Sequence, residues 1–317
     1  TVITRRVQES YVQPYFILWV SHSLWVVILP LHAAYERLKR RRRTLGELRL
    51  EALVGSAKLI VQRRQRAQQG AAYEALHAGE DDGARALALS RPGWVVLRAA
   101  GLAALLAALL NASAYLWYVA VGFASMSKVT AIYNTSCFFA YLFSVLLLRE
   151  RVQAVKCAAV GVSIVGVALM ALGDARADVA TKMPGDRVSG AAASRAELLG
   201  DALSLACACG IGLYQVLYKK HAVPAGFHSL FHVNFMTALL GACTLAVFWA
   251  PIPALHALRV ERFRWPDAQQ LALIAANAAF GVAYNAGFMI ALALTSPLFA
   301  AIGVMLTIPA MAAVDMA

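Results

Sequence analysis

The sequence predicts an all-α polytopic membrane protein, and three observations lead to this class. First, the 317 residues are 61% hydrophobic and only 15% charged, with a mean hydropathy of +0.63. Soluble domains are about half apolar and about a quarter charged. Second, eight apolar runs are long enough to cross about 30 Å of hydrocarbon as helices. Third, several polar residues lie inside these runs, where lipid cannot hydrogen-bond them.

The eight runs are too long and too continuously apolar to be the alternating strands of a barrel. The second run exceeds the length of a span, which predicts a tilted helix or a first turn at the membrane interface. The predicted spans cover residues 15–35, 95–123, 129–148, 153–172, 198–218, 228–250, 270–294 and 297–315.

The net charge of +12 is unevenly distributed along the chain. Seven basic residues follow the first span closely, which places the 36–93 loop in the cytosol and residues 1–14 on the opposite side by the positive-inside rule. Basic residues beside a span attract anionic lipid, and we expect this rather than nucleic-acid binding. The seven are Arg37, Lys39, Arg40, Arg41, Arg42, Arg43 and Arg49.

Two connections between the predicted spans are long. The 36–93 loop has Arg-rich, Gln-rich and Gly/Ala/Asp patches and is predicted to be mostly disordered, with a surface helix near 45–66. The polar segment 173–197 is predicted to be a linker between halves of four spans each. The apolar face of the predicted surface helix consists of Leu45, Leu48, Leu53, Ala57 and Ile60.

The two halves show a faint internal repeat. Residues 119–125 align with residues 290–296, and in both places a long span is followed by a tight turn and another span. Pro297 suits a helix start, with Ser296 as its N-cap. Inverted repeats need an odd number of spans each, so we expect one span to be missing at each end of a partial chain that starts with Thr and stops within an apolar run.

Polar residues in the second predicted span share one helix face. Asn111, Tyr115 and Tyr118 follow i, i+4, i+7 spacing, which aligns an amide and two phenols. One interpretation is a cavity wall that stacks on and hydrogen-bonds an organic solute. The other is hydrogen bonding between helices together with an aromatic belt at the interface.

The third predicted span contains consecutive polar residues, Tyr133, Asn134, Thr135 and Ser136. Four neighbouring residues cannot all face one partner helix, so we expect some of them to meet water or solute. Tyr284 and Asn285 occupy the corresponding span of the second half, and their cavity and packing interpretations both stay open.

Few charged residues lie in or near spans, and each requires an explanation. For Glu150 we favour an interfacial anchor or a salt bridge between the two repeats over proton coupling. Asp201 is predicted near a helix N-terminus, where the helix dipole favours a carboxylate, with proton coupling as the alternative. Lys128 is predicted to be a solvated turn residue. No metal site is expected from His228 and His232, and the five cysteines are expected to be unpaired packing residues.

Four stretches resemble the drug/metabolite transporter superfamily in its EamA-type branch, and especially the F subgroup of solute carrier family 35 and fungal vacuolar-type members. Residues 130–151, with Leu148-Arg-Glu-Arg151, are similar to the fourth helix of the family. Residues 200–219, with Tyr214 and Lys219, resemble the sixth. Residues 291–315, with Pro309 and Asp315, resemble the eighth-to-ninth junction and ninth helix, and Gln13-Pro-Tyr-Phe16 resembles the start of the second.

The resemblance implies ten helices in two inverted five-helix repeats. Residues 1–172 would then be a first repeat that lacks its first helix, 173–197 a linker, and 198–317 a second repeat that lacks its last helix. The implied function is a secondary transporter that moves a small organic metabolite across a vacuolar or Golgi-type endomembrane by alternating access.

We expect no enzymatic activity, because no Walker-type loop, G-x-S-x-G or H-E-x-x-H pattern is present. No cofactor, metal or nucleic-acid partner is expected. The predicted partners are the solute and the lipid bilayer, and a homodimer stays open. The alternative function is a non-transporting membrane scaffold or receptor that uses the 36–93 loop.

Overall fold

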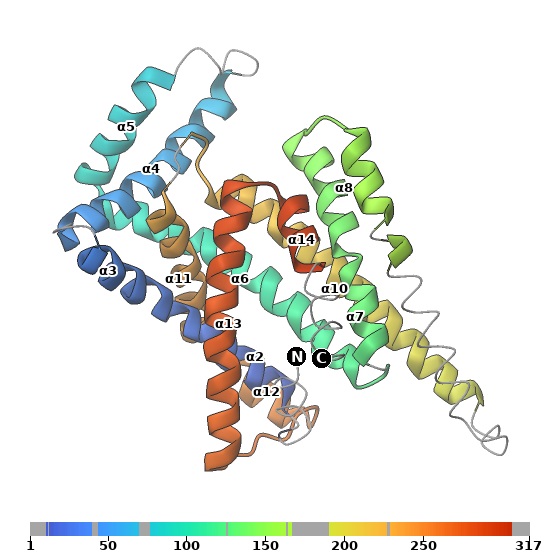
Figure 1. The fold of residues 1–317 in the computed structure, drawn as a ribbon. Helices are drawn as coiled ribbons and strands as arrows, with labels where there is room; N and C mark the ends of the chain where they lie inside the picture. Colours follow the sequence, from blue (N-terminus) through green and yellow to red (C-terminus); the bar gives the residue numbers. More distant parts are fainter. Residues whose placement is uncertain are drawn as a thin grey trace. The chain divides into compact units, whose positions relative to one another are not determined.

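The computed structural model describes residues 11, 13–39, 44–69, 77–124, 126–162, 164–166, 190–226 and 229–305, and the regular elements in these ranges are all helical (Figure 1). Six helical stretches are long and apolar enough to cross a membrane. This confirms the predicted all-α polytopic class. The six are Pro14–Leu38, Pro92–Val121, Lys128–Leu148, Arg195–Ala222, Leu230–Val247 and Ala268–Leu294.

The other two predicted spans lie only partly within the described residues. A shorter apolar helix, Ala154–Gly166, begins the span predicted at 153–172. The helix α14, Pro297–Met305, begins the span predicted at 297–315. The remaining residues of both spans lie outside the described part of the chain.

The chain forms two compact units, each of which contains residues from both predicted repeats. The first unit comprises 1–108 and 217–294, and the second comprises 109–216 and 295–317. The assignment of the repeats to 1–172 and 198–317 stays a prediction.

Two long helices, α6 (Pro92–Val121) and α10 (Gly190–Ala222), contribute to both units. The other elements of the first unit are α2 (Pro14–Ser23), η1 (Leu24–Val27), α3 (Ile28–Lys39), α4 (Leu45–Gln69), α5 (His77–Ser90), α11 (Leu230–Val247), α12 (Pro251–Ala257) and α13 (Ala268–Leu294). The second unit contains α7 (Met126–Asn134), α8 (Ser136–Leu148), the helix at 154–166 and α14.

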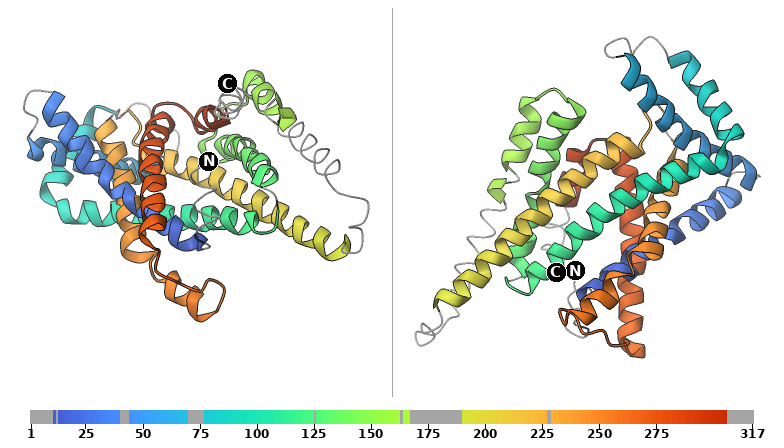
Figure 2. Two further views of the ribbon diagram at one scale, coloured as in Figure 1. Left: turned by 60° about the horizontal axis from the view of Figure 1, so that its bottom comes forward. Right: turned by 180° about the vertical axis from the view of Figure 1, so that it is seen from behind.

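In the first unit, α11 packs against α2, η1, α3, α4 and α13 (Figures 1 and 2). Gly241 of α11 permits a close approach to the backbone of η1. A Cβ at this position would lie 2.6 Å from the backbone nitrogen of Val26 and 2.9 Å from Cβ of Trp25. The missing side chain therefore lets α11 contact the backbone of the first span directly.

The first span is not a continuous α-helix, because the 3₁₀ segment η1 separates α2 from α3. A polar triplet, Ser21-His22-Ser23, immediately precedes η1. The hydroxyl oxygens of Ser21 and Ser23 are buried without a hydrogen-bond partner. Short 3₁₀ segments inside longer helices often mark hinges or strain.

The start of α2 is fixed by the segment that follows α12. The Tyr11 hydroxyl lies 2.6 Å from the carbonyl oxygen of Arg264, and Gln13 Nε2 donates to the carbonyl of Arg262 at 2.9 Å. Glu261 accepts from the backbone N–H of Tyr15 at 3.1 Å and so caps the helix N-terminus. Burial, reinforced by the negative charge of Glu261, raises the pKa of Tyr11 to about 12, so this phenol is a neutral donor.

The prediction that the 36–93 loop is mostly disordered is wrong for the described residues. The helix expected near 45–66 is confirmed as α4, and a second helix, α5, packs beside it (Figure 1). The two share a small apolar core with the start of α6, formed by Leu53, Ala57, Ala84, Ala88 and Val95. Lys58 is buried and pairs with Asp81 at 2.6 Å. The helix α5 was not predicted from the sequence, because its apolar positions are mostly alanines.

The helix α4 also docks on the connection between α10 and α11. Gln62 makes two hydrogen bonds with the backbone of Ala225, donating to its carbonyl at 3.0 Å and accepting from its N–H at 3.2 Å. The imidazole of His232 lies 3.3 Å from the carbonyls of both Ala52 and Ala222. At Gly55, a Cβ would lie only 2.4 Å from Nδ1 of His232, so the glycine is required for this contact.

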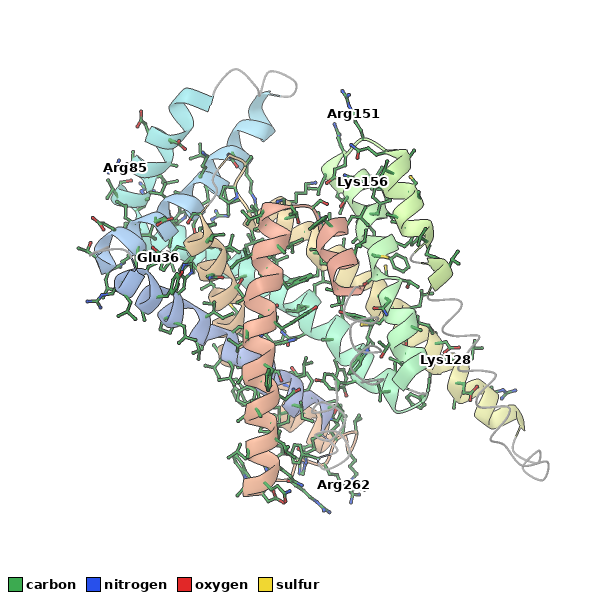
Figure 3. The ribbon with its side chains drawn as sticks, viewed as in Figure 1. Glu36, Arg85, Lys128, Arg151, Lys156 and Arg262 are labelled. Atoms are coloured by element: carbon green, nitrogen blue, oxygen red, sulfur yellow. The ribbon has the colours of Figure 1, made fainter. Side chains whose placement is uncertain are left out.

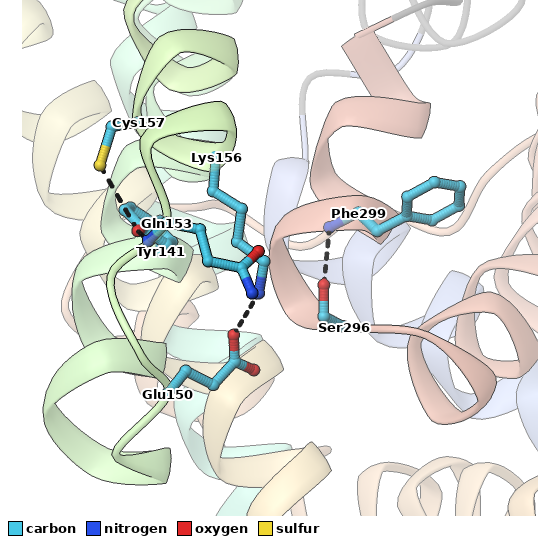
Figure 4. Close-up of polar contacts among 7 residues, drawn as sticks. All are labelled: Tyr141, Glu150, Gln153, Lys156, Cys157, Ser296 and Phe299. Atoms are coloured by element: carbon cyan, nitrogen blue, oxygen red, sulfur yellow. Dashed lines mark hydrogen bonds and ion pairs between the residues drawn. The ribbon is translucent and has the colours of Figure 1, made fainter.

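In the second unit, α8 packs against α14 and the helix at 154–166. The buried core consists of Cys137, Ala140, Tyr141, Val160, Leu298 and Ala301. The predicted N-cap at the start of α14 is confirmed, because Ser296 Oγ accepts from the N–H of Phe299 at 3.3 Å (Figure 4). None of the five cysteines is joined in a disulfide, and Cys157 is exposed rather than packed in a core.

Candidate functional site: an interrupted helix lined with polar side chains

The third span is interrupted within the predicted polar run. The helix α7 ends at Asn134 and α8 begins at Ser136, with Thr135 forming a turn between them. The Thr135 hydroxyl donates to the carbonyl of Ile132 at 2.6 Å, and its backbone N–H bonds the same carbonyl at 3.0 Å. This i−3 bonding tightens one turn and interrupts the i−4 ladder without a proline or glycine, while Thr135 keeps helical dihedrals (φ −66°, ψ −7°) and α7 and α8 remain one span.

The break carries a buried amide that no described group satisfies. Asn134 is only 5% exposed, and its Nδ2 has no hydrogen-bond partner. The residue lies about 10 Å along the Lys128–Leu148 span from its start. An unpaired amide at this depth is costly unless water or a solute meets it.

Two further uncharged side chains in the second unit each bury one polar atom without a partner. Ser144 lies on α8, two turns after the break, and its Oγ is unpaired. Gln215 lies on α10, and its Oε1 is unpaired. Sequence reasoning did not identify Gln215, although a glutamine within an apolar span was a visible signal.

Close helix crossings hold these elements together. A Cβ at Gly210 of α10 would lie 2.1 Å from Ser113 Oγ on α6, and a Cβ at Gly212 would lie 2.8 Å from the backbone nitrogen of Ala140 on α8. Both glycines therefore permit α10 to touch α6 and α8 directly.

The face of α6 predicted to line a cavity lies on the side opposite its contact with α10. Ser113 is two residues from Asn111, so the two point in nearly opposite directions around the helix. Asn111 is buried, whereas Tyr115 and Tyr118 are partly exposed. Tyr118 packs edge-to-face on Trp117 with ring centroids 5.2 Å apart. The structure thus leaves the i, i+4, i+7 face clear of the Gly210 crossing.

The second-half candidates lie in the first unit, on α13. Asn285 is buried, and its Nδ2 has no partner, whereas Tyr284 is 54% exposed and stacks on Phe288. The two side chains therefore point in different directions. Only Asn285 shares the buried, unpaired character of Asn134.

The charged candidates are engaged in ion pairs. Glu150 bonds Lys156 at 2.7 Å just beyond the end of α8 (Figure 4). Asp201 pairs with Lys128 at 2.9 Å, and Lys128 lies within α7 rather than in the predicted turn, with its side chain 37% exposed. The expected dipole role of Asp201 is wrong, because α10 begins at Gly190, about three turns earlier. Among the described residues, no cluster of metal-binding side chains occurs.

Comparisons with known proteins show what this part of the chain is similar to. Residues 84–172 match the EamA-like transporter family. The predicted resemblance to EamA-type drug/metabolite transporters is confirmed. The matched EamA-like segment begins within α5, includes α6, α7 and α8, and so contains Asn111 and the break at Thr135.

A relative from Schizosaccharomyces pombe (strain 972 / ATCC 24843), named as an uncharacterised transporter, is 28% identical over 190 residues. The alignment covers 60% of this chain and 52% of that protein, so the chain matches about half of its relative's length. One solved structure, described only as a crystal structure of a protein, covers 93% of this chain and 95% of its own, with 16% identity and a TM-score of 0.37. A score this low does not establish a shared fold.

Proposed function

We propose that this chain is part of a secondary transporter that carries a small organic metabolite across a membrane by alternating access. The observation that carries the proposal is the break at Thr135, beside the buried and unpaired amide of Asn134. Interrupted spans with free polar groups are the usual way in which transporter folds bind solutes inside a bilayer. The EamA-like match over residues 84–172 supports the same class.

In this proposal, the solute contacts the amide of Asn134 and the aromatic face of α6. Asn111, Tyr115, Tyr118, Tyr133 and Thr135 would supply further hydrogen bonds and stacking surface in the second unit. Tyr284 and Asn285 stay predicted solute contacts within the first unit. The 3₁₀ segment η1 would give the first span, which belongs to the first unit, a flexible point of its own. Glu150 and Asp201 serve structure through their ion pairs rather than coupling transport to protons.

We further propose that the protein resides in a vacuolar or Golgi-type endomembrane and resembles the F subgroup of solute carrier family 35. Its 36–93 loop would face the cytosol, as the basic residues after the first span favour.

The test uses the full-length protein in proteoliposomes that are incubated in a cell metabolite extract. Metabolites that accumulate with the wild type, and not in empty liposomes, define the solute. Their uptake should fall about tenfold or more in Asn134→Leu and in Tyr133→Ala. Ser204→Ala is the matched control, because that buried hydroxyl is already satisfied by the carbonyl of Gly200 at 2.8 Å. Uptake that is unchanged in both variants would refute the site.

Deleting the 36–93 loop would not distinguish the transporter function from the alternative scaffold function. Because α4 bonds the α10–α11 connection through Gln62 and packs on His232, its loss would destabilise the first unit itself. A sharper test replaces exposed α5 residues, such as Arg85 (Figure 3), and asks whether solute uptake persists. A carrier keeps its uptake in such variants.

A further inference from the structure

A pocket of about 450 Å³ lies between α4 and the first half of α6, within the first unit. The α4 wall includes Leu59, Ile60 and Arg63, which lie on one face of that helix. The α6 wall includes Arg98, Gly101 and Leu105, which also share a face. The pocket belongs to neither the break at Thr135 nor the other proposed solute contacts.

The polar part of this pocket is positively charged. Arg63 and Arg98 both line it, and Arg98 is exposed. The guanidinium of Arg98 lies 5.1 Å from the ring centroid of Trp94, and among the described residues it has no acidic partner. Stacking on the ring leaves the edge N–H groups of the guanidinium available for an anion.

The length of α6 places these residues at the depth of lipid headgroups. The helix has 30 residues, about 45 Å, whereas the hydrocarbon core needs about 20 residues. If the last 20 residues cross the core, Arg98 lies about one turn outside it and Trp94 about two turns outside. Tryptophan and arginine are typical of this interfacial zone. Leu105 then lies just inside the hydrocarbon.

The pocket therefore changes from cationic to apolar along the membrane normal. Leu97 and Leu105 are 70% and 73% exposed, so apolar surface continues from the arginines into the bilayer. At Gly101, nothing lies within 4 Å of the position a Cβ would occupy, which leaves a channel on this face of α6. A free phosphate compound would match only the cationic end.

We propose that this pocket binds one anionic phospholipid. Its phosphate accepts hydrogen bonds from Arg98 and Arg63, and an acyl chain follows the channel past Gly101 and Leu105. Basic pockets beside membrane helices select anionic headgroups in this way. The bound lipid would join α4 to α6 at the face of the membrane that carries the 36–93 loop.

The first experiment measures lipid retention by the full chain in detergent micelles with native mass spectrometry. The probes are equal amounts of palmitoyl-oleoyl phosphatidylserine and phosphatidylcholine. The wild type should retain one phosphatidylserine preferentially, and Arg98→Gln should weaken this retention about fivefold, the effect of one basic residue near a lipid surface. Arg85→Gln is the matched control, because it removes the same charge from an exposed site on α5 that does not line the pocket.

A second variant tests the acyl channel without changing charge. Gly101→Leu should fill the open space and abolish phosphatidylserine retention while the melting temperature stays unchanged. Gly161→Leu is its control, because that exposed helical glycine also has open space at its Cβ position.

Three outcomes would overturn the proposal. One is equal retention of both lipids, and another is an equal loss of retention in Arg98→Gln and Arg85→Gln, which would indicate general electrostatic attraction. The third is displacement of phosphatidylserine by millimolar glycerophosphoserine, which would assign the pocket to a soluble phosphate compound.

Discussion

Asn134, Ser144 and Gln215 share one physical property in the second unit: each buries a polar atom that no described group bonds. Such atoms cost about 1–3 kcal/mol each in a sealed core. In the proposed transporter, a hydrated solute path would remove this cost. Residues that serve binding are therefore expected to be neutral or unfavourable for stability.

Ser144 and Ser204 form a matched pair for this idea. The Ser204 hydroxyl bonds the carbonyl of Gly200, and the Ser144 hydroxyl has no partner. We predict that Ser144→Ala lowers solute uptake severalfold without lowering the melting temperature in detergent. Ser204→Ala should leave uptake within about twofold of wild type. A drop in melting temperature for Ser144→Ala would show instead that its hydroxyl holds helices together.

Glu150 tests the distinction between a structural and a coupling charge. Its ion pair with Lys156 is about a quarter exposed, so the pair is worth about 0–1 kcal/mol. We predict that Glu150→Gln changes the melting temperature slightly and leaves the pH profile of uptake unchanged. Loss of the pH dependence in this variant would make Glu150 a proton carrier.

At the scale of elements, the docking of α4 depends on one glycine. A methyl group at Gly55 would overlap the His232 ring, and overpacking of this kind costs about 1–3 kcal/mol. We predict that Gly55→Ala lowers the unfolding free energy by that amount and that the double variant with His232→Ala is less destabilised than the sum of the two.

Gly46→Ala is the control for this prediction. It lies on the same helix, and the nearest atom to its Cβ position is Thr44 Oγ1 at 3.7 Å. Alanine there should stabilise α4 slightly through its higher helix propensity. Equal effects at both glycines would contradict a specific contact with His232.

Some of these helices could be predicted from the sequence, and others could not. The six long spans were predictable because 20-residue apolar runs have few alternatives in a membrane. The helix α5 was not, because the alanines of its buried face give almost no hydrophobic contrast. The break at Thr135 was also missed, since a threonine side chain makes it and no proline marks it. The polar run around it was nevertheless visible in the sequence.

At the scale of the whole molecule, contacts within the first unit constrain the topology. The helix α4 bonds the α10–α11 connection, so both lie on one membrane face. Between them lie three candidate spans, Pro92–Val121, Lys128–Leu148 and Arg195–Ala222. Three crossings would end on the opposite face. The contact therefore favours a fourth crossing at the predicted span 153–172.

This topology predicts which sites react from the same side. In sealed vesicles of a cysteine-free background, single cysteines at Arg85 and Ala225 should react with an impermeant thiol reagent from one face. A cysteine at Trp265, which is 83% exposed, should react only from the other. Labelling of Arg85→Cys and Ala225→Cys from opposite faces would exclude the fourth crossing.

The proposed function requires the break beside Asn134 to open onto water inside the bilayer. The most direct measurement is the reactivity of Asn134→Cys, in the same cysteine-free protein in liposomes, toward a charged, water-soluble thiol reagent. Ala140→Cys is the control, because that position is fully buried in the α8–α14 core. We expect Asn134→Cys to react at least about tenfold faster than Ala140→Cys. Equal, negligible reactivity at both positions would contradict it.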